Sequence, residues 1–206
     1  AVGCRIAQRS KLRSMVEGNE KLLQEAIHAD YGKQEFDTFL TEFYFVYEEI
    51  ATAIAGVQEW SKTKPVTTNM LNAPAKSYII AEPLGVSLVI GPWNYPYQLT
   101  MGPVVAAMAA GCTIILRPSE LTPHCSGLLA KLIRQHFSPE YFAVVEGGIP
   151  ETTELLAQKF DMIFFTGSVA VGKIVYQAAA KNLTPVVLEL GGKSPVIIAP
   201  DCDLNE

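Results

Sequence analysis

The sequence predicts an α/β fold, a doubly wound and mostly parallel β-sheet preceded by helices at its N-terminal end. Two observations carry this prediction. From residue 84 onward, short continuous apolar segments alternate with helical segments, which is the pattern of a parallel sheet covered on both faces. Before that point the apolar residues recur at helical spacing. With 206 residues the chain is long enough to bury roughly 70% of its unfolded surface.

The first third is predicted to be helical, over residues 1–63, because one apolar stripe recurs at steps of three and four residues. The stripe consists of Phe39, Phe43, Val46, Ile50, Ile54 and Val57, and we expect it to pack in a core. Residues 64–75 are polar and rich in Pro, and residues 77–82 are extended in character. We therefore expect residues 64–82 to form a connector or an excursion that serves oligomerisation.

The βα-alternating core is predicted over residues 83–206. Strands are expected at 84–90, 112–118, 142–147, 162–166, 185–190 and 195–199, and helices at 98–110, 126–136, from Pro150 onward, and at 169–181. In such a sheet, ligands bind at the carboxyl ends of the strands. The loops expected there collect unusual residues, in the order GPWNYP, RPSE, EGG, TGS and ELGGKSP, which predicts a functional site at this edge.

The composition narrows the class of protein. The net charge is −5 and no run of Lys or Arg occurs, so nothing indicates a nucleic-acid partner. Four cysteines lie far apart without a C-x-x-C motif or a Cys/His cluster, so neither a metal site nor a disulfide framework is expected. No secretory signal is recognisable, and the most apolar run, 104–116, is too short to span a bilayer. We expect a cytoplasmic protein, with membrane association only through segments outside this chain.

Both ends have the character of an excerpt. The chain begins without Met and inside a helical apolar pattern formed by Ile6, Leu12, Met15 and Val16. At the other end, Asp203 with Glu206 three residues later is typical of a helix N-cap with its reciprocal acid. We therefore expect a helix to open where the sequence stops.

The segment MIFFTGSVAVGK predicts a strand, a tight turn and a helix. Gly167 would permit close approach of the backbone, and Ser168 would stand at the positive end of a helix that suits a pyrophosphate. The spacing from Gly167 to Gly172 departs from the G-x-G-x-x-G fingerprint. A plain glycine turn with a serine N-cap explains the segment equally well.

Four other side chains, at three places in the sequence, have two interpretations each. Arg117 and Glu120 lie at the end of the second strand, where an acid can accept ribose hydroxyls, or they form a solvated ion pair. Asn94 can brace its own turn, or its amide can donate to an oxyanion. Glu189, near the end of an apolar strand, is either a partly buried general base or the partner of Lys193.

Taken together, these motifs resemble the aldehyde dehydrogenase superfamily, closest to its class-three, fatty-aldehyde branch. The strings EPLGVSLVIGPWNYP and LTPVVLELGGKSP carry the resemblance, which extends over nearly all of the chain. It implies a Rossmann-like nicotinamide-cofactor domain, here partial and without the catalytic domain. In that family a Cys thiolate attacks the aldehyde, hydride passes to the nicotinamide, and water cleaves the resulting thioester.

The resemblance also implies roles for individual residues. Asn94 would donate to the oxyanion, and Glu189 would activate water. Glu120 would accept the adenosine-ribose hydroxyls, and Arg117 occupies the place of the family's usual Lys, which puts the choice between NAD and NADP in doubt. The cofactor-binding set would be Gly167, Ser168, Val169, Ala170, Val171, Gly172, Arg117, Glu120, Trp93 and Leu190.

The nucleophilic Cys implied by the resemblance lies beyond Glu206. None of Cys4, Cys112, Cys125 and Cys202 replaces it, and we interpret Cys202 as structural. The implied function is oxidation of an aldehyde, medium- or long-chain or aromatic, with NAD as cofactor and NADP tolerated, in a protein that is a homodimer when full-length. Two rivals remain. A relative that acylates coenzyme A or reduces an acyl phosphate usually lacks a Glu at position 189, and a natural fragment would bind cofactor without catalysis.

Overall fold

A computed structural model of the chain describes residues 2–202. The N-cap expected at Asp203 with Glu206 lies outside the described residues. A five-stranded parallel sheet, of strand order β5-β4-β3-β6-β7, forms the centre of the fold. Its strands are β3 (Val86–Ile90), β4 (Thr113–Arg117), β5 (Phe142–Val144), β6 (Met162–Gly167) and β7 (Val186–Leu190). The predicted α/β fold with a parallel sheet is confirmed.

The sheet is doubly wound. From β3 the chain runs outward through β4 and β5, then returns to the other side of β3 with β6 and β7. The helices that make these connections are α5 (Gln98–Ala110), α6 (Pro123–His136), α7 (Ile149–Ala157) and α8 (Val169–Ala180). The strand order reverses beside β3, and a crevice at such a reversal is where doubly wound sheets bind ligands.

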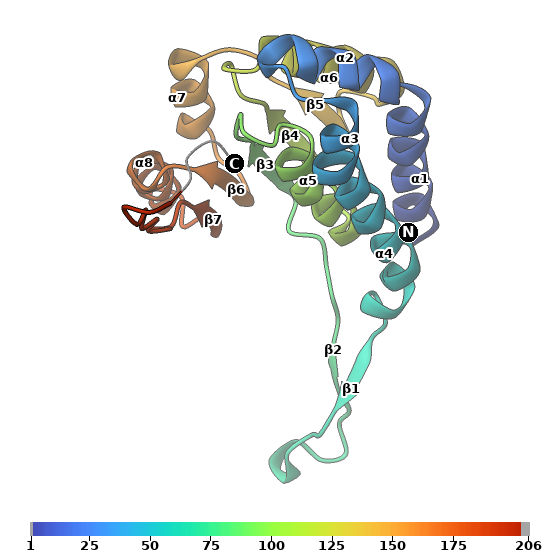
Figure 1. The fold of residues 1–206 in the computed structure, drawn as a ribbon. Coiled ribbons are helices and arrows are strands. Elements are labelled where there is room, and N and C mark those ends of the chain that lie inside the picture. The colour runs from blue at the N-terminus through green and yellow to red at the C-terminus, as the bar shows by residue number, and fades with distance from the viewer. Residues whose placement is uncertain (1, 203–206) are drawn as a thin grey trace.

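Two hydrophobic cores cover the two faces of the sheet. Val89 and Leu116 point into the larger core, which α5 and α6 share with the N-terminal helices. Leu88 and Ile90 point into the smaller core beneath α7 and α8. Successive residues of β3 therefore face opposite layers, as the two-residue period of a strand requires. In Figure 1, α7 and α8 lie on the opposite side of the sheet from α1 and α4.

The N-terminal segment is helical as predicted, with α1 (Val2–Gly18), α2 (Glu20–Tyr31), α3 (Glu35–Thr38) and α4 (Tyr44–Trp60). A short π-helix, η1 (Phe39–Phe43), joins α3 to α4. Of the predicted apolar stripe, Phe43, Val46, Ile50 and Val57 are buried and Ile54 packs against the core. Phe39 is 41% exposed, because the wider π turn rotates it out of line with the stripe.

Between α4 and β3 the chain leaves the body of the fold as a long hairpin (Figure 1). Strands β1 (Lys64–Val66) and β2 (Ser77–Ile79) pair antiparallel, and the 3₁₀ helix η2 (Met70–Asn72) lies near the tip. Apolar side chains on this hairpin are exposed, and Leu71 is 95% exposed. The segment predicted over 64–82 is thus a protruding arm.

The strand predicted at 195–199 is wrong. This run has no regular secondary structure, and Ile197 is 94% exposed. Its β-branched residues favour a strand, but a strand forms only beside a neighbour, and Pro195 lacks the N–H that a ladder needs. Smaller differences concern boundaries: α6 begins at Pro123 and β5 ends at Val144. No helix in the described part of the chain is both long and apolar enough to cross a membrane.

Candidate functional site

The residues predicted to be functional gather at the carboxyl edge of the parallel sheet. The Asn94 turn follows β3, Arg117 ends β4, Gly167 ends β6, and Glu189 lies next to the last residue of β7. Since β3, β6 and β7 are neighbours in the sheet, the Asn94 turn and Glu189 stand on either side of the loop that opens α8. Within residues 2–202, no hydrogen bond joins the Asn94 and Glu189 side chains.

The start of α8 has the form that an anion requires. Ser168 is the N-cap, and its Oγ accepts a hydrogen bond from the Val171 N–H at 3.3 Å. The Gly172 N–H donates to the Ser168 carbonyl at 2.9 Å. The N–H groups of Val169 and Ala170 precede the first intrahelical bonds and lie at the positive end of the helix dipole. Both residues are exposed, so a ligand can reach them.

Gly172 allows α8 to pack closely on the last strand. A Cβ at this position would lie 2.7 Å from Cδ2 of Leu190, closer than real Cβ contacts occur. Leu190 itself pairs with Gly167 across β6 and β7. The structure therefore brings together Gly167, Gly172 and Leu190, which the sequence placed in one cofactor site, and gives a packing reason for the second glycine.

Glu189 is exposed, so the expectation of a partly buried carboxylate is wrong. The reason is the position of its strand: within the described residues β7 has a sheet neighbour on one side only, β6. The alternative partner, Lys193, forms no ion pair with Glu189 in the described part of the chain. The Glu189 carboxylate is thus held by its backbone register alone, opposite Thr166.

Thr166 is a polar residue at this edge that the sequence reasoning did not assign. Its Oγ1 is buried and has no hydrogen-bond partner. A buried hydroxyl without a partner costs free energy, about 1–3 kcal/mol, and so deserves a functional explanation. The signal available in the sequence was a hydroxyl residue directly before the Gly167–Ser168 turn.

The Asn94 turn is braced by residues other than Asn94. The main-chain carbonyl of Asn94 accepts a hydrogen bond from the Tyr31 hydroxyl at 3.2 Å. The N–H groups of Tyr97 and Gln98 donate to the carboxylate of Glu42, at 3.1 and 2.8 Å. The Asn94 side chain is exposed and, within residues 2–202, makes no hydrogen bond of its own. Of the two readings of Asn94, bracing of its own turn through the side chain is therefore excluded.

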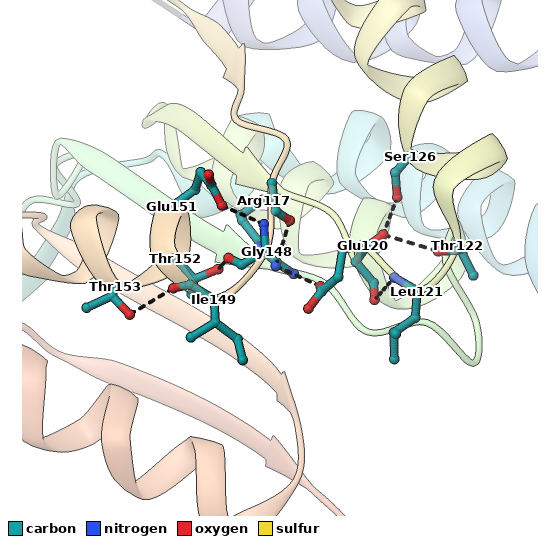
Figure 2. Close-up of polar contacts among 12 residues, drawn as sticks. Arg117, Glu120, Leu121, Thr122, Ser126, Gly148, Ile149, Glu151, Thr152 and Thr153 are labelled. Carbon is teal, nitrogen blue, oxygen red and sulfur yellow. Dashed lines mark hydrogen bonds and ion pairs between the residues drawn. The ribbon is translucent and has the colours of Figure 1, made fainter.

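Arg117 and Glu120 form an ion pair, but the arginine is not solvated. Arg117 Nη2 lies 2.7 Å from Glu120 Oε2 and donates to the Gly147 carbonyl at 2.9 Å. The Arg117 side chain is buried, whereas that of Glu120 is 42% exposed. Figure 2 shows Arg117 between Glu120 and the turn that opens α7. The guanidinium therefore ties the end of β4 to the loop after β5.

That loop depends on a glycine. Gly147 has φ of 142°, a conformation that L side chains rarely adopt, and a Cβ there would lie 2.5 Å from the Glu151 side chain. Glu151 in turn accepts a hydrogen bond from the Gly148 N–H at 2.7 Å, which Figure 2 also draws.

A pocket of about 210 Å³ lies beside the Arg117–Glu120 ion pair. It is lined by Pro118, Ser119, Glu120, Pro123, Ser126, Glu146 and Gly147.

Comparison with known proteins identifies the family. The profile of the aldehyde dehydrogenase family matches residues 4–206. This chain belongs to that family. It is 49% identical over 201 residues to a rat protein, "Aldehyde dehydrogenase, dimeric NADP-preferring", and equally to "Aldehyde dehydrogenase family 3 member A2" of Pongo abelii. The alignments cover 98% of this chain but 44% and 41% of those proteins.

A solved aldehyde dehydrogenase has the same fold. The substrate-bound structure of AldH from Staphylococcus aureus superimposes with a TM-score of 0.92 at 45% identity, over 97% of this chain and 44% of that one. The chain thus spans less than half the length of the aldehyde dehydrogenases that it matches.

The four cysteines of this aldehyde dehydrogenase chain form a buried pair and an exposed pair by accessibility. Cys112 and Cys125 are buried, while Cys4 and Cys202 are exposed. Burial raises the pKa of the Cys125 thiol, which keeps it protonated and unreactive. Cys4 lies in α1 and Cys112 directly before β4, at the opposite end of the strand from Arg117.

Proposed function

We propose that this chain supplies the cofactor site and two catalytic groups of an enzyme that oxidises an aldehyde to a carboxylic acid with NAD(P). The carrying observation is that the Asn94 amide, the Glu189 carboxylate and the free N–H groups of α8 stand at one sheet edge without competing partners. Unpaired polar groups that converge at a strand-order reversal are the usual sign of a reaction site.

The residues present fit a dinucleotide. The N–H groups of Val169 and Ala170 would bind its pyrophosphate, with Ser168 and Gly172 shaping the turn. Trp93, Val171 and Leu190, all partly exposed at this edge, would supply apolar contacts. The buried hydroxyl of Thr166 would gain a hydrogen-bond partner from the bound ligand. When bound, the nicotinamide accepts a hydride.

Asn94 and Glu189 would act on the substrate. The Asn94 amide is free to donate to an oxyanion, and its main chain is fixed by other residues, so little reorganisation is needed during the reaction. The Glu189 carboxylate is free to take a proton from water. The nucleophilic Cys would come from the part of the full-length protein beyond Glu206.

NAD is the proposed cofactor, with NADP tolerated. Glu120 would accept the ribose hydroxyls, and its charge would oppose a 2′-phosphate. Arg117 could favour that phosphate, but its guanidinium is buried and already bonded to Glu120 and Gly147. One relative is named as NADP-preferring, so the margin between the cofactors is expected to be moderate.

The remaining parts of the proposal concern substrate and assembly. We propose a medium- or long-chain or aromatic aldehyde as substrate, and a cytoplasmic homodimer as the full-length protein. The protruding hairpin, with Val66, Met70, Leu71 and Ile79 exposed, would pack against the second copy, because unpaired strand edges and apolar patches mark interfaces. Transfer of the acyl group to coenzyme A is disfavoured because Glu189 is present.

The test is a single substitution in the full-length protein that contains this chain. Asn94→Ala should lower the rate of aldehyde-dependent NADH formation by about 10²–10³-fold, the usual effect of removing one oxyanion donor. Cofactor affinity, measured by fluorescence titration of NADH, should stay unchanged. If the parent protein forms no NADH with any aldehyde but reduces an acyl phosphate or acyl-CoA, the proposed reaction is wrong.

A further inference from the structure

We propose that Glu42 is a positioning residue for Asn94, holding the turn between β3 and α5 from beneath so that the Asn94 amide stays aimed at the reaction site. The inference rests on the proposed function of Asn94 and deepens it. Glu42 belongs to η1, in the N-terminal helical segment, and lies 55 residues before Tyr97 in the sequence.

The first half of the argument is the set of contacts that Glu42 makes. Its carboxylate is fully buried, at 0% exposure. Oε2 accepts the N–H groups of both Tyr97 and Gln98, while Oε1 accepts from the Lys33 ammonium at 2.9 Å. Tyr97 is the N-cap of α5 and Gln98 its first residue. The carboxylate therefore acts as a helix cap supplied from a distant element.

A second set of contacts reaches the same turn from the same side. The Lys33 ammonium lies 4.6 Å from the centre of the Tyr95 ring, and the Tyr31 hydroxyl donates to the Asn94 carbonyl. Asn94 itself and the residues that follow it in the turn are thus held by Tyr31, Lys33 and Glu42. These three side chains come from the end of α2, the loop after it and η1.

The Tyr97 side chain completes the brace within the core. Its hydroxyl donates to the Leu23 carbonyl at 2.8 Å, and its ring stacks on Phe43 at 5.7 Å between centroids. Phe43 directly follows Glu42 in η1. A π turn is rare and frequently marks a functional site, and here it presents Glu42 and Phe43 to the same residue, Tyr97.

A buried carboxylate is expensive, which argues for a specific task. Loss of hydration raises the pKa of Glu42, and the N–H donors and Lys33 only partly oppose that shift. An apolar residue at this position would avoid the cost, but it would leave the Tyr97 and Gln98 N–H groups without acceptors. The result of the arrangement is a turn whose main chain is hydrogen-bonded at Asn94, Tyr97 and Gln98, while the Asn94 side chain is left unbound.

The test is a double-mutant cycle in the full-length protein, read as the single-turnover rate of NADH formation. Glu42→Gln should slow this rate by up to about 10²-fold, the cost of misplacing a catalytic group by about 1 Å. The dissociation constant for NADH should not change. In an Asn94→Ala background, the same substitution should cost less than about twofold, because Glu42 acts only through Asn94. Glu49→Gln, on an exposed position of α4, is the matched control.

Each outcome decides something. Equal losses from Glu42→Gln in the two backgrounds would show a general structural role and overturn the proposal, as would an unchanged rate. If Asn94→Ala alone has no effect, it is the proposed oxyanion role that fails. Should Glu42→Gln not fold, Lys33→Met and Tyr31→Phe perturb the same turn from nearer the surface. They must show the same dependence on Asn94, and a loss that persists in the Asn94→Ala background would overturn the proposal.

Discussion

The two groups proposed as catalytic, Asn94 and Glu189, are held in very different ways. The Asn94 turn is fixed by hydrogen bonds from Tyr31 and to Glu42, both from the N-terminal helices. Glu189 lies on an edge strand, exposed and without a side-chain partner in the described part of the chain. One region is braced by the core of this chain, and the other is held by backbone register alone.

This difference matches the different requirements of the two proposed catalytic roles. An oxyanion donor works best when its position is fixed before the reaction, whereas a general base must exchange its proton with water. The braced turn suits the first task and the exposed carboxylate suits the second. The comparison also predicts that changes at Glu189 affect chemistry alone, while changes beneath Asn94 affect both chemistry and stability.

The largest expected effect is complete loss of reaction in this chain by itself. Purified residues 1–206 should form no NADH from an aldehyde, because Asn94 and Glu189 cannot form the covalent intermediate that a positioned thiolate provides. The measurement is NADH absorbance with excess aldehyde and NAD. Turnover that disappears with Cys202→Ser or Cys112→Ser would show that the nucleophile lies within this chain.

Next in size is the effect of Glu189→Gln in the full-length protein. Loss of a general base should lower steady-state oxidation by about 10²–10⁴-fold. The melting temperature should stay the same, because the side chain is exposed and Gln is nearly isosteric. Glu154→Gln, exposed on α7, is the control. Parent-like turnover would remove Glu189 from the mechanism, and a large drop in melting temperature would contradict the comparison of the two regions.

The parts of the candidate site that are built from residues adjacent in the chain were predictable from the sequence. The start of α8 follows from an apolar strand, Gly167 and a Ser168 cap, all adjacent in the chain, and α5 falls at residues 98–110 as expected. The sheet edge where the loops meet follows from the alternation of strands and helices.

The contacts that Tyr31, Lys33 and Glu42 make with the Asn94 turn were not predictable, because these residues are far from the turn in the sequence. Glu42 belongs to a helical segment in which Phe39 precedes it by three residues and Val46 follows it by four. That spacing places an acid on the apolar face, and this was the signal that could have marked it. The exposure of Glu189 was missed for another reason: strand composition does not reveal whether a strand is central or at an edge.

Cofactor choice should show a smaller effect. The specificity constant for NAD should exceed that for NADP by about tenfold, a difference of about 1.4 kcal/mol. Glu120→Gln should narrow the ratio because it removes the charge that opposes a 2′-phosphate. Arg117→Lys should leave the preference for NAD in place, since the guanidinium is engaged by Gly147 and Glu120. An NADP preference above tenfold in the parent would show that Arg117 reaches the phosphate.

The smallest expected effect is a pH dependence of stability from the buried carboxylate. Burial raises the folded-state pKa of Glu42 above its ordinary value of 4.5, and Lys33 opposes only part of this rise. Besides burial, the Glu42 carboxylate also raises the pKa values of Tyr31, Tyr97 and Cys125. These three groups are neutral at acidic pH, so their titration does not contribute there. At a pH between the pKa of Glu42 in the unfolded chain and its higher pKa in the folded chain, Glu42 is protonated in the folded chain and deprotonated in the unfolded chain.

Stability contributed by this group therefore rises as the pH falls through the folded pKa toward 4.5. Lys33→Met should raise that pKa further and lower the melting temperature most at neutral pH, where the carboxylate is charged without its cation. The difference in melting temperature between Lys33→Met and the parent should shrink as the pH is lowered. In the Lys33→Met, Glu42→Gln double variant, the difference from the parent should no longer depend on pH in this way. Thermal unfolding of the full-length protein at several pH values measures it. A deficit of constant size would mean that Lys33 stabilises the turn through Tyr95 alone, and the charge on Glu42 would then have no part in the difference between the two regions.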